Sequence, residues 1–282
     1  QDQLMAPARF IKEEQLTFWF SVPSSAILLE RLRLLKPGAF PYLRVSLFCG
    51  EALPLSTALQ WKAAAPNSRV LDLYGPTEAT IAITAYELDE AALKAKHGLV
   101  SIGTPFPQAK VLVLDPEGRA AERGELLLGG PQVTTGYWND PERTAEAFVV
   151  PPGEHDLFYR TGDRVERDAD GDLYFIGRLD DQVKVRGHRI ELGEVAHVLK
   201  DITQAAFAYV LAHPVRDGLA QGLVAVLPGA QAEQERSILA ACAERLPDYM
   251  VPTTLHFTDD IPYNSSGKAD LRALLERLDA GA

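Results

Sequence analysis

The stretch Leu73-Tyr74-Gly75-Pro76-Thr77-Glu78, followed by Ala79-Thr80, decides the fold because it places an aromatic ring, a tight turn, a hydroxyl and a carboxylate close together. Residues 69–73 before it read as a short buried strand, and open α/β sheets bind ligands at the carboxyl ends of their strands. Tyr74 could therefore stack on a base, Thr77 could donate to a phosphate, and Glu78 could hold a magnesium ion, which prefers carboxylate and phosphate oxygens. The alternative is an ordinary Gly-Pro turn followed by the start of a helix.

The flanking segments extend this strand into an α/β fold. Residues 43–49 read as a second buried strand, and residues 56–65 read as a helix that stops before Pro66. Further on, residues 110–114 and 125–128 predict strands joined by a turn at 115–118, which indicates an antiparallel, barrel-like subdomain. The acidic turn at 168–171 could be a calcium loop, but the downstream glutamate of an EF-hand is missing, so a plain hairpin turn is favoured.

The last third of the chain has a different pattern. A hairpin after residue 180 is followed by a helix at 193–201, strands at 205–212 and 222–227, a helix at 232–246 and a strand at 253–257. This order is typical of a small α+β domain. The sequence therefore predicts two domains, residues 1–179 and residues 180–282.

Composition narrows the class of protein. The 282 residues are 46% hydrophobic and 24% charged, an ordinary globular balance, and the net charge of -11 argues against nonspecific binding to nucleic acid. Cys49 and Cys242 lie too far apart in the sequence to indicate a disulfide framework or a zinc site, so a reducing cytoplasm fits. We find no apolar run long enough to span a membrane, and the polar start Gln1-Asp2-Gln3 is not typical of a signal peptide.

Further motifs follow the first one in a fixed order. They occupy residues 124–128, 136–138, 159–163, 177–194 and 264–268. Together they closely resemble the successive motifs of the adenylate-forming superfamily, in particular the amino-acid adenylation domains of nonribosomal peptide synthetases and the D-alanine:carrier-protein ligases. The resemblance covers about residues 21 to 268. It implies that residues 1–179 are the C-terminal part of a large domain with a parallel sheet and a distorted β-barrel, and that residues 180–282 form a small mobile α+β domain.

The resemblance assigns roles around ATP and Mg²⁺. Joining a carboxylate to the α-phosphate builds negative charge on a pentacoordinate phosphorus, so such a site needs cations more than acid–base groups. The implied catalytic residues are Lys268, Glu78 and Thr77, with Glu78 as the metal ligand, although a lysine in a polar loop is usually only solvated. Asp163 would accept both ribose hydroxyls, and Arg178 would clamp ribose or phosphate. The nucleotide-binding set is Gly50, Glu51, Asp72, Leu73, Tyr74, Gly75, Asp163 and Arg178.

One position departs from the family pattern. Relatives usually have Asn two residues before the tyrosine, whereas this chain has Asp72. A carboxylate can accept from the exocyclic amine of adenine but cannot donate, which puts the fine nucleotide preference in doubt.

The small domain and the substrate pocket are also assigned by resemblance. Asp180 would be the hinge about which the small domain rotates, and Arg186 and Gly187 would face the incoming thiol. The expected amino-acid pocket is apolar and crowded, which favours a small aliphatic substrate such as D-alanine or L-proline over a charged or aromatic one. Its residues are Ser21, Leu47, Cys49, Leu73, Ile81 and Ala82. Cys49 could equally be an ordinary buried strand cysteine.

The function that follows is ATP-dependent formation of an aminoacyl-AMP and its transfer to the phosphopantetheine thiol of a carrier protein. Complete members of the superfamily are about twice as long as this chain, and the missing N-terminal half carries a phosphate loop. We therefore expect a fragment of a longer enzyme, or one half of a split or cleaved enzyme with its other half bound, and a poor catalyst when the chain is alone. The alternatives are an acyl-CoA ligase and a non-catalytic module that binds a partner protein. The residues at 182–192 favour amino-acid activation over the first alternative.

Overall fold

The computed structural model describes residues 7–179, 182–205, 207–216, 219–229, 232–263 and 269–280. The chain divides into two compact units, Gln1–Asp180 and Asp181–Ala282. No helix in the described ranges is long and apolar enough to cross a membrane.

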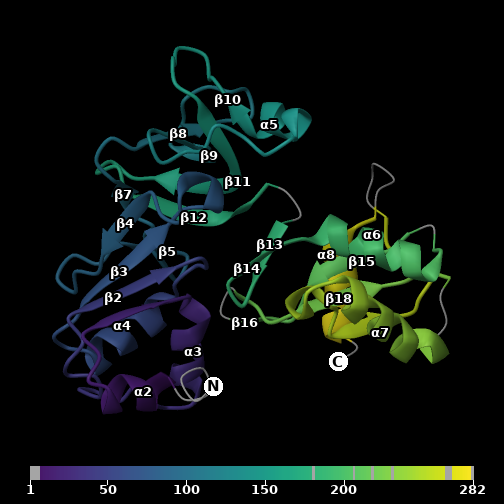
Figure 1. Ribbon diagram of the computed structural model, residues 1–282, viewed down its shortest axis with the longest axis horizontal. Helices are drawn as coiled ribbons and strands as arrows, with labels where there is room; N and C mark the ends of the chain where they lie inside the picture. The colour runs from purple at the N-terminus through teal and green to yellow at the C-terminus, as the bar shows by residue number, and fades with distance from the viewer. Residues whose placement is uncertain are drawn as a thin grey trace. The chain divides into compact units, whose positions relative to one another are not determined.

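The first unit begins with a mixed five-stranded sheet (Figure 1). Its strand order is β1 (Phe18–Ser21), β2 (Val45–Cys49), β3 (Arg69–Tyr74), β4 (Thr84–Glu87) and β7 (Thr104–Pro105). The pairings of β1 with β2 and of β2 with β3 are parallel, and those of β3 with β4 and of β4 with β7 are antiparallel. The carboxyl ends of β2 and β3 therefore lie at the same edge, where Gly50 and Gly75 leave the sheet.

Helices α2 (Pro7–Glu13), α3 (Pro23–Arg31) and α4 (Leu55–Ala64) accompany this sheet. Their shared core is centred on the fully buried Trp61, whose ring packs against the rings of Trp19, Phe40 and Phe48. Helix α4 ends just before Pro66, as expected, because a residue before proline avoids the helical conformation. The α/β class predicted from the sequence is confirmed.

The rest of the first unit is antiparallel. Strands β10 (Phe148–Val149), β11 (Phe158–Arg167), β9 (Arg123–Gly129) and β8 (Lys110–Leu114) pair in that order, and β12 (Leu173–Arg178) pairs with β11. Two short strands, β5 (Ala95–Lys96) and β6 (Leu99–Val100), form a separate hairpin, and helix α5 (Pro141–Ala147) begins at an Asp140 cap. The single-turn helix η1 (Thr77–Ala79) follows β3 directly.

The acidic turn between β11 and β12 is a plain turn held together by its own side chains. Asp168 accepts backbone N–H bonds from Asp170 and Asp172, at 3.0 Å and 2.9 Å. The Lys94 ammonium lies 2.8 Å from the Asp170 carboxylate and 2.6 Å from that of Asp172. A protein cation thus stands where a calcium ion would have to bind.

The second unit holds two small sheets and three helices in its described ranges. One sheet has the order β14 (His188–Glu191), β13 (Gln182–Val185), β17 (Leu219–Ala220) and β16 (Val215–Arg216), and the other has the order β15 (Tyr209–Ala212), β18 (Leu223–Val226) and β19 (Thr254–His256). The helices are α6 (Leu192–Thr203), α7 (Glu235–Arg245) and α8 (Leu271–Ala280), with single turns η2 (Ala232–Gln234) and η3 (Asp248–Met250). Helix α8 was not predicted, and the expected helix at 232–246 is divided into η2 and α7.

Candidate nucleotide and amino-acid site

The central feature of the site is a buried triad of Tyr74, Asp163 and Arg178. The Tyr74 hydroxyl donates to Oδ2 of Asp163 at 2.5 Å, and Nη1 of Arg178 donates to Oδ1 at 2.6 Å. Asp163 is only 4% exposed. Strand pairing puts Asp163 of β11 directly opposite Arg178 at the end of β12, while Tyr74 arrives from the end of β3. Residues 89 positions apart in the sequence thus meet at one carboxylate.

Two effects act on this triad. Burial, together with the nearby Asp163 carboxylate, raises the pKa of Tyr74 well above its ordinary value, so the hydroxyl stays a donor at neutral pH. Thr161 fixes the backbone, because its hydroxyl accepts from the Asp163 N–H at 2.9 Å and donates to the Leu126 carbonyl at 2.7 Å. Thr161 was not singled out from the sequence, although it lies within the motif at 159–163.

Glu78 lies four residues beyond Tyr74, in η1, and is buried. Its Oε1 accepts from the Tyr137 hydroxyl at 2.6 Å, and its main-chain carbonyl accepts from the Thr134 N–H at 2.8 Å. Burial and the contact with Glu78 raise the pKa of Tyr137. Next to Tyr137, Trp138 is 91% exposed.

Glu78 and Thr77 fit a magnesium ion whose other ligands would be phosphate oxygens of the substrate. Among the described residues, no three His, Cys, Asp or Glu side chains gather into a metal site of their own. Mg²⁺ is commonly held by one or two carboxylates together with substrate phosphate oxygens, and the Glu78 carboxylate, with the exposed Thr77 next to it in the chain, suits that arrangement.

The chain after Glu78 is unusually constrained. Thr80 and Ile81 both have positive φ angles, 56° and 71°, which is uncommon for residues other than glycine and a genuine outlier for a β-branched one. A Cβ added at Gly75 would lie 2.7 Å from Cα of Ala82, so only glycine permits the chain just after β3 to lie this close to the returning loop. The Ile83 N–H also donates to the Tyr74 carbonyl at 2.8 Å.

The predicted pocket residues fall into two groups. Cys49 is paired with Leu73 in neighbouring parallel strands, and its thiol lies 3.6 Å from the Ile81 carbonyl, so β2, β3 and the loop at 81–82 come together. Ile81 is 63% exposed, whereas Ala82 is buried. Leu47 shares the sheet face of Cys49, two residues away.

Ser21 belongs to the other group. It is paired with Phe48, which puts it on the opposite face of the sheet from Leu47 and Cys49, and its hydroxyl accepts from Trp19 Nε1 at 2.9 Å. Membership of the pocket stays a prediction for all six residues, and Ser21 is the one whose strand position favours it least.

The remaining predicted residues can also be located. Gly50 leaves β2 with a φ of 94°, and the buried Glu51 accepts from the Ser24 N–H in the first turn of α3 at 2.8 Å, a favourable place for a carboxylate. Asp72 is buried in β3.

In the second unit, Arg186 and Gly187 form the two-residue turn of the β13–β14 hairpin, both with positive φ. Lys268 and Asp180 lie outside the described residues.

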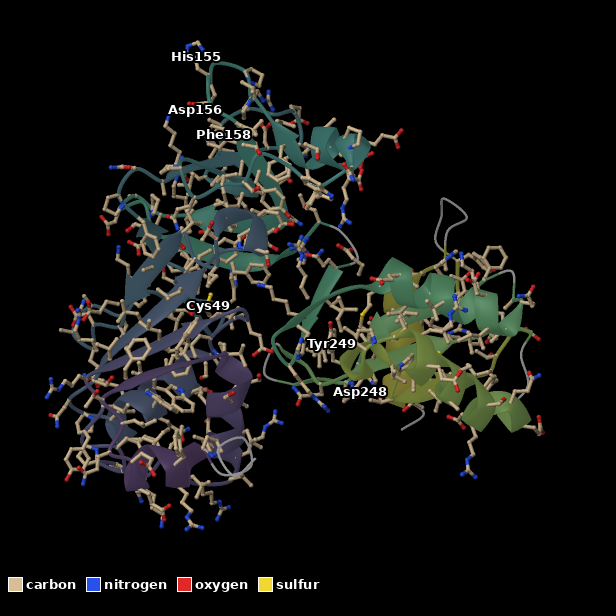
Figure 2. The ribbon with its side chains drawn as sticks, in the orientation of Figure 1. Cys49, His155, Asp156, Phe158, Asp248 and Tyr249 are labelled. Atoms are coloured by element: carbon tan, nitrogen blue, oxygen red, sulfur yellow. The ribbon has the colours of Figure 1, made fainter. Side chains whose placement is uncertain are left out.

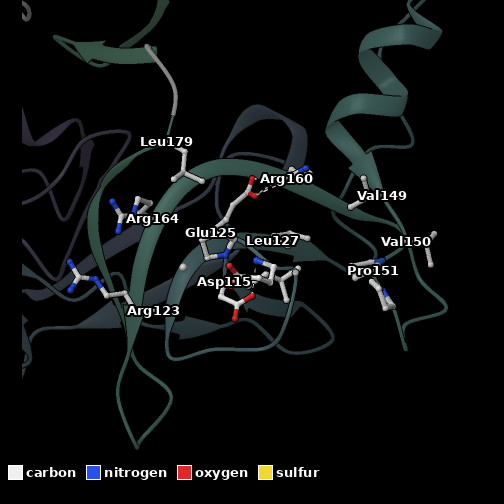
Figure 3. Close-up of a pocket in the computed structure, with 16 residues that line it drawn as sticks. Asp115, Arg123, Glu125, Leu127, Val149, Val150, Pro151, Arg160, Arg164 and Leu179 are labelled. Atoms are coloured by element: carbon white, nitrogen blue, oxygen red, sulfur yellow. Dashed lines mark hydrogen bonds and ion pairs between the residues drawn. The ribbon is translucent and has the colours of Figure 1, made fainter. Parts of the chain in front are cut away.

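A separate hollow of about 730 Å³ lies on the face of β9 and β11 (Figure 3). Arg123, Arg160 and Arg164 line it, and Arg160 is paired there with Glu125 at 2.5 Å. None of the predicted site residues contributes to it.

Comparison with known proteins agrees with this geometry. Residues 1–138 match the family model described as AMP-binding enzyme. Among curated relatives, this chain is 32% identical over 281 residues to the D-alanine–D-alanyl carrier protein ligase of Bacillus licheniformis, covering 95% of this chain and 54% of the relative. It is 35% identical over 277 residues to the delta-poly-L-ornithine synthetase of Acinetobacter baumannii, covering 95% of this chain and 20% of that protein.

The solved structures show the same fold. The adenylation domain AlmE of Vibrio cholerae, determined in complex with glycyl-adenosine-5′-phosphate, superposes with a TM-score of 0.89 at 35% identity, covering 99% of this chain and 53% of that one. The chain spans about half the length of the D-alanine–D-alanyl carrier protein ligases that it matches. The resemblance to the adenylate-forming superfamily inferred from the motifs is confirmed.

Proposed function

We propose that this chain contributes the nucleotide and amino-acid site of a ligase that activates a small amino acid with ATP and transfers it to a carrier-protein thiol. The observation that supports this most directly is that Tyr74 and Arg178 both donate hydrogen bonds to the buried carboxylate of Asp163. Glu78 lies four residues after Tyr74 in the sequence. A relative named D-alanine–D-alanyl carrier protein ligase and a solved relative in complex with glycyl-adenosine-5′-phosphate support a small substrate.

The proposed chemistry has two steps. In the first, a carboxylate oxygen of the amino acid attacks the α-phosphorus of ATP, and the bond to pyrophosphate breaks. In the second, a thiolate attacks the acyl carbon, and AMP leaves with the electron pair of the acyl–oxygen bond. A Mg²⁺ ion held by Glu78 would neutralise charge on the phosphates.

The protein side chains bind and orient the nucleotide in this scheme. Asp163, held in place by Thr161, would accept the ribose hydroxyls, and Arg178 would exchange part of its contact with Asp163 for the ribose or a phosphate. Lys268 would bridge the substrate carboxylate and the phosphate, and rotation about Asp180 would bring Arg186 and Gly187 to the thiol. We further propose that the reaction takes place in the cytoplasm.

Substrate-dependent exchange of pyrophosphate into ATP tests the proposal. Because the matched ligases are about twice as long, the assay uses the full-length protein that contains this chain. We expect exchange with one of glycine, D-alanine, L-alanine or L-proline, and little with glutamate, lysine or tryptophan. Absence of exchange with every small amino acid would refute it, and transfer to free CoA in preference to a carrier protein would identify an acyl-CoA ligase instead.

A further inference from the structure

The loop after β9 is hydrogen-bonded repeatedly to the loop that carries Glu78, Ile81 and Ala82. The two segments are residues 132–137 and residues 78–82, and they belong to the same unit. Four hydrogen bonds join them: Thr134 N–H to the Glu78 carbonyl at 2.8 Å, the Tyr137 hydroxyl to Glu78 Oε1 at 2.6 Å, the Thr80 hydroxyl to the Gln132 carbonyl at 2.8 Å, and Gln132 Nε2 to the Ala82 carbonyl at 2.9 Å.

Gln132 takes part in two of these bonds, and they bracket the constrained residues. Its main-chain carbonyl holds the side chain of Thr80, and its side-chain amide holds the main chain of Ala82. Between them Thr80 and Ile81 keep the left-handed conformation. Such a conformation persists in non-glycine residues only where the surroundings fix it, and the Gln132 side chain supplies that restraint from one side.

Gly75 supplies the restraint from the other side. Its α-carbon faces Ala82 with no space for even a methyl group. The loop at 80–82 therefore cannot move toward β3, and the Gln132 amide opposes movement away from it. A small displacement of this loop would carry both Ile81 and Ala82 with it.

We propose that Gln132 is a positioning residue that sets amino-acid specificity, by fixing the left-handed loop that places Ile81 and Ala82 beside Cys49 and Leu73. This inference rests on the proposed function. If it is correct, the preference for a small aliphatic substrate has two causes. One is the apolar character of the pocket residues, and the other is the fixed position of the loop at 80–82.

The test compares steady-state pyrophosphate exchange by the full-length enzyme and by Gln132→Met, which keeps the length of the side chain but cannot donate to the Ala82 carbonyl. We expect KM for the preferred small amino acid to rise about five- to tenfold, the range for loss of one good hydrogen bond. We expect KM for ATP to stay the same, and the discrimination against leucine and phenylalanine to weaken. Gln60→Met, in helix α4, is the matched control and should leave all three quantities unchanged.

Further variants keep the proposal falsifiable. Gln132→Asn keeps the amide but shortens its reach by one methylene, and it is measured in the same way if Gln132→Met does not fold. Adding Thr80→Asn to Gln132→Met should restore specificity in part, because asparagine tolerates the left-handed conformation.

Two outcomes would overturn the proposal: unchanged amino-acid KM and selectivity in the folded variant, or an equal rise in KM for ATP and amino acid, which would indicate a general structural role. Failure of the proposed function itself would be recognised separately, as absence of exchange in the unmodified enzyme.

Discussion

Asp163 is the residue on which the proposed nucleotide site depends most. Both of its oxygens already accept hydrogen bonds, from Tyr74 and Arg178, so the carboxylate is held in a fixed orientation before any ligand arrives. Asp163→Asn would replace one acceptor with a donor and remove the charge. We expect nucleotide affinity, measured by titration calorimetry with the full-length protein, to fall about tenfold or more, since hydrogen bonds to charged groups are worth about 1.5–3 kcal/mol.

Asp156 provides the control for this change. It lies in an exposed loop and pairs with Lys110 at 2.5 Å (Figure 2). Exposed ion pairs contribute little, so Asp156→Asn should bind nucleotide normally. Equal affinity in Asp163→Asn and Asp156→Asn would contradict the assignment of Asp163 to the ribose.

Tyr74 makes stability sensitive to alkaline pH. Because its pKa is raised in the folded state, the folded chain holds the proton more tightly than the unfolded chain does. The contribution of Tyr74 to the free energy of unfolding is complete below the ordinary tyrosine pKa of about 10. It is lost as the pH rises from there toward the pKa in the folded state. We expect the urea midpoint of the first unit, followed by circular dichroism, to fall as the pH rises above about 10.

Tyr74→Phe tests that explanation. The variant should be less stable at neutral pH by about 1–3 kcal/mol, because a buried acceptor loses its donor, and its midpoint should fall less steeply with pH. Tyr137 and Tyr174 also have raised pKa values, so some alkaline dependence should remain. An identical pH slope in Tyr74→Phe and the unmodified chain would show that this hydroxyl is not responsible.

At the residue scale, the sequence indicates which residues to assign to the candidate site, but it does not indicate which hydrogen bonds join them. Tyr74 and Asp163 were each assigned to the nucleotide, but a bond between positions 89 residues apart depends on how β3 meets β11 and β12. Gln132 carried no local signal at all. A glutamine in a loop is usually solvated, and only the approach of the 80–82 loop gives its amide a partner.

At the scale of elements, the β13–β14 hairpin is fixed to the body of its unit by an aromatic stack. The centroid of the His188 ring lies 3.8 Å from the centroid of the Tyr249 ring, and the angle between the two ring planes is only 5°. Tyr249 belongs to η3 and is labelled in Figure 2. His188 directly follows the Arg186-Gly187 turn, whose two positive φ angles suit a tight two-residue hairpin.

Tyr249→Ala should therefore loosen the hairpin. We expect faster amide hydrogen exchange in β13 and β14 and a loss of about 0.5–1.5 kcal/mol, the usual value of an aromatic pair. Tyr249→Phe keeps the ring and should behave like the unmodified chain. Unchanged protection in Tyr249→Ala would mean that the stack does not restrain the hairpin.

Elements with a strong hydrophobic pattern were predicted well, and short or polar ones were not. The strands at 45–49 and 69–74 and the helix at 55–64 lie within two residues of their predicted places, because each is bounded by a glycine or a proline. Strands β16 and β17 have two residues each, too few for any periodicity to show. Helix α8 is not among the predicted elements, although Leu271, Leu274 and Leu275 have helical spacing.

At the scale of the whole molecule, each unit has hydrophobic clusters of its own, two in each among the described residues. The second unit packs α6 and α7 against β15 and β18 around Val195, Leu199 and Cys242, all of which are fully buried. We therefore expect a fragment of residues 181–282 to fold by itself and to unfold in one cooperative transition, as followed by circular dichroism in urea.

A shorter fragment provides the comparison. Starting at residue 192 instead removes the β13–β14 hairpin but keeps the helices, so it should fold with lower stability. A fragment of 181–282 that stays unfolded would show that the second unit depends on the first. The sequence predicts two domains because the pattern of elements changes near residue 180. It does not predict which residues form their cores, since that depends on which helix faces pack against which sheets.

The exposure of Trp138 gives this chain a built-in optical reporter. The sequence contains three tryptophans, and Trp19 and Trp61 are stacked on each other in the first core with Trp61 fully buried. Trp138 is nine-tenths exposed and adjoins Tyr137, whose hydroxyl reaches Glu78. A collisional quencher such as iodide would act mainly on Trp138 emission, so the shielding of this fluorophore would report on whatever covers the surface next to Tyr137.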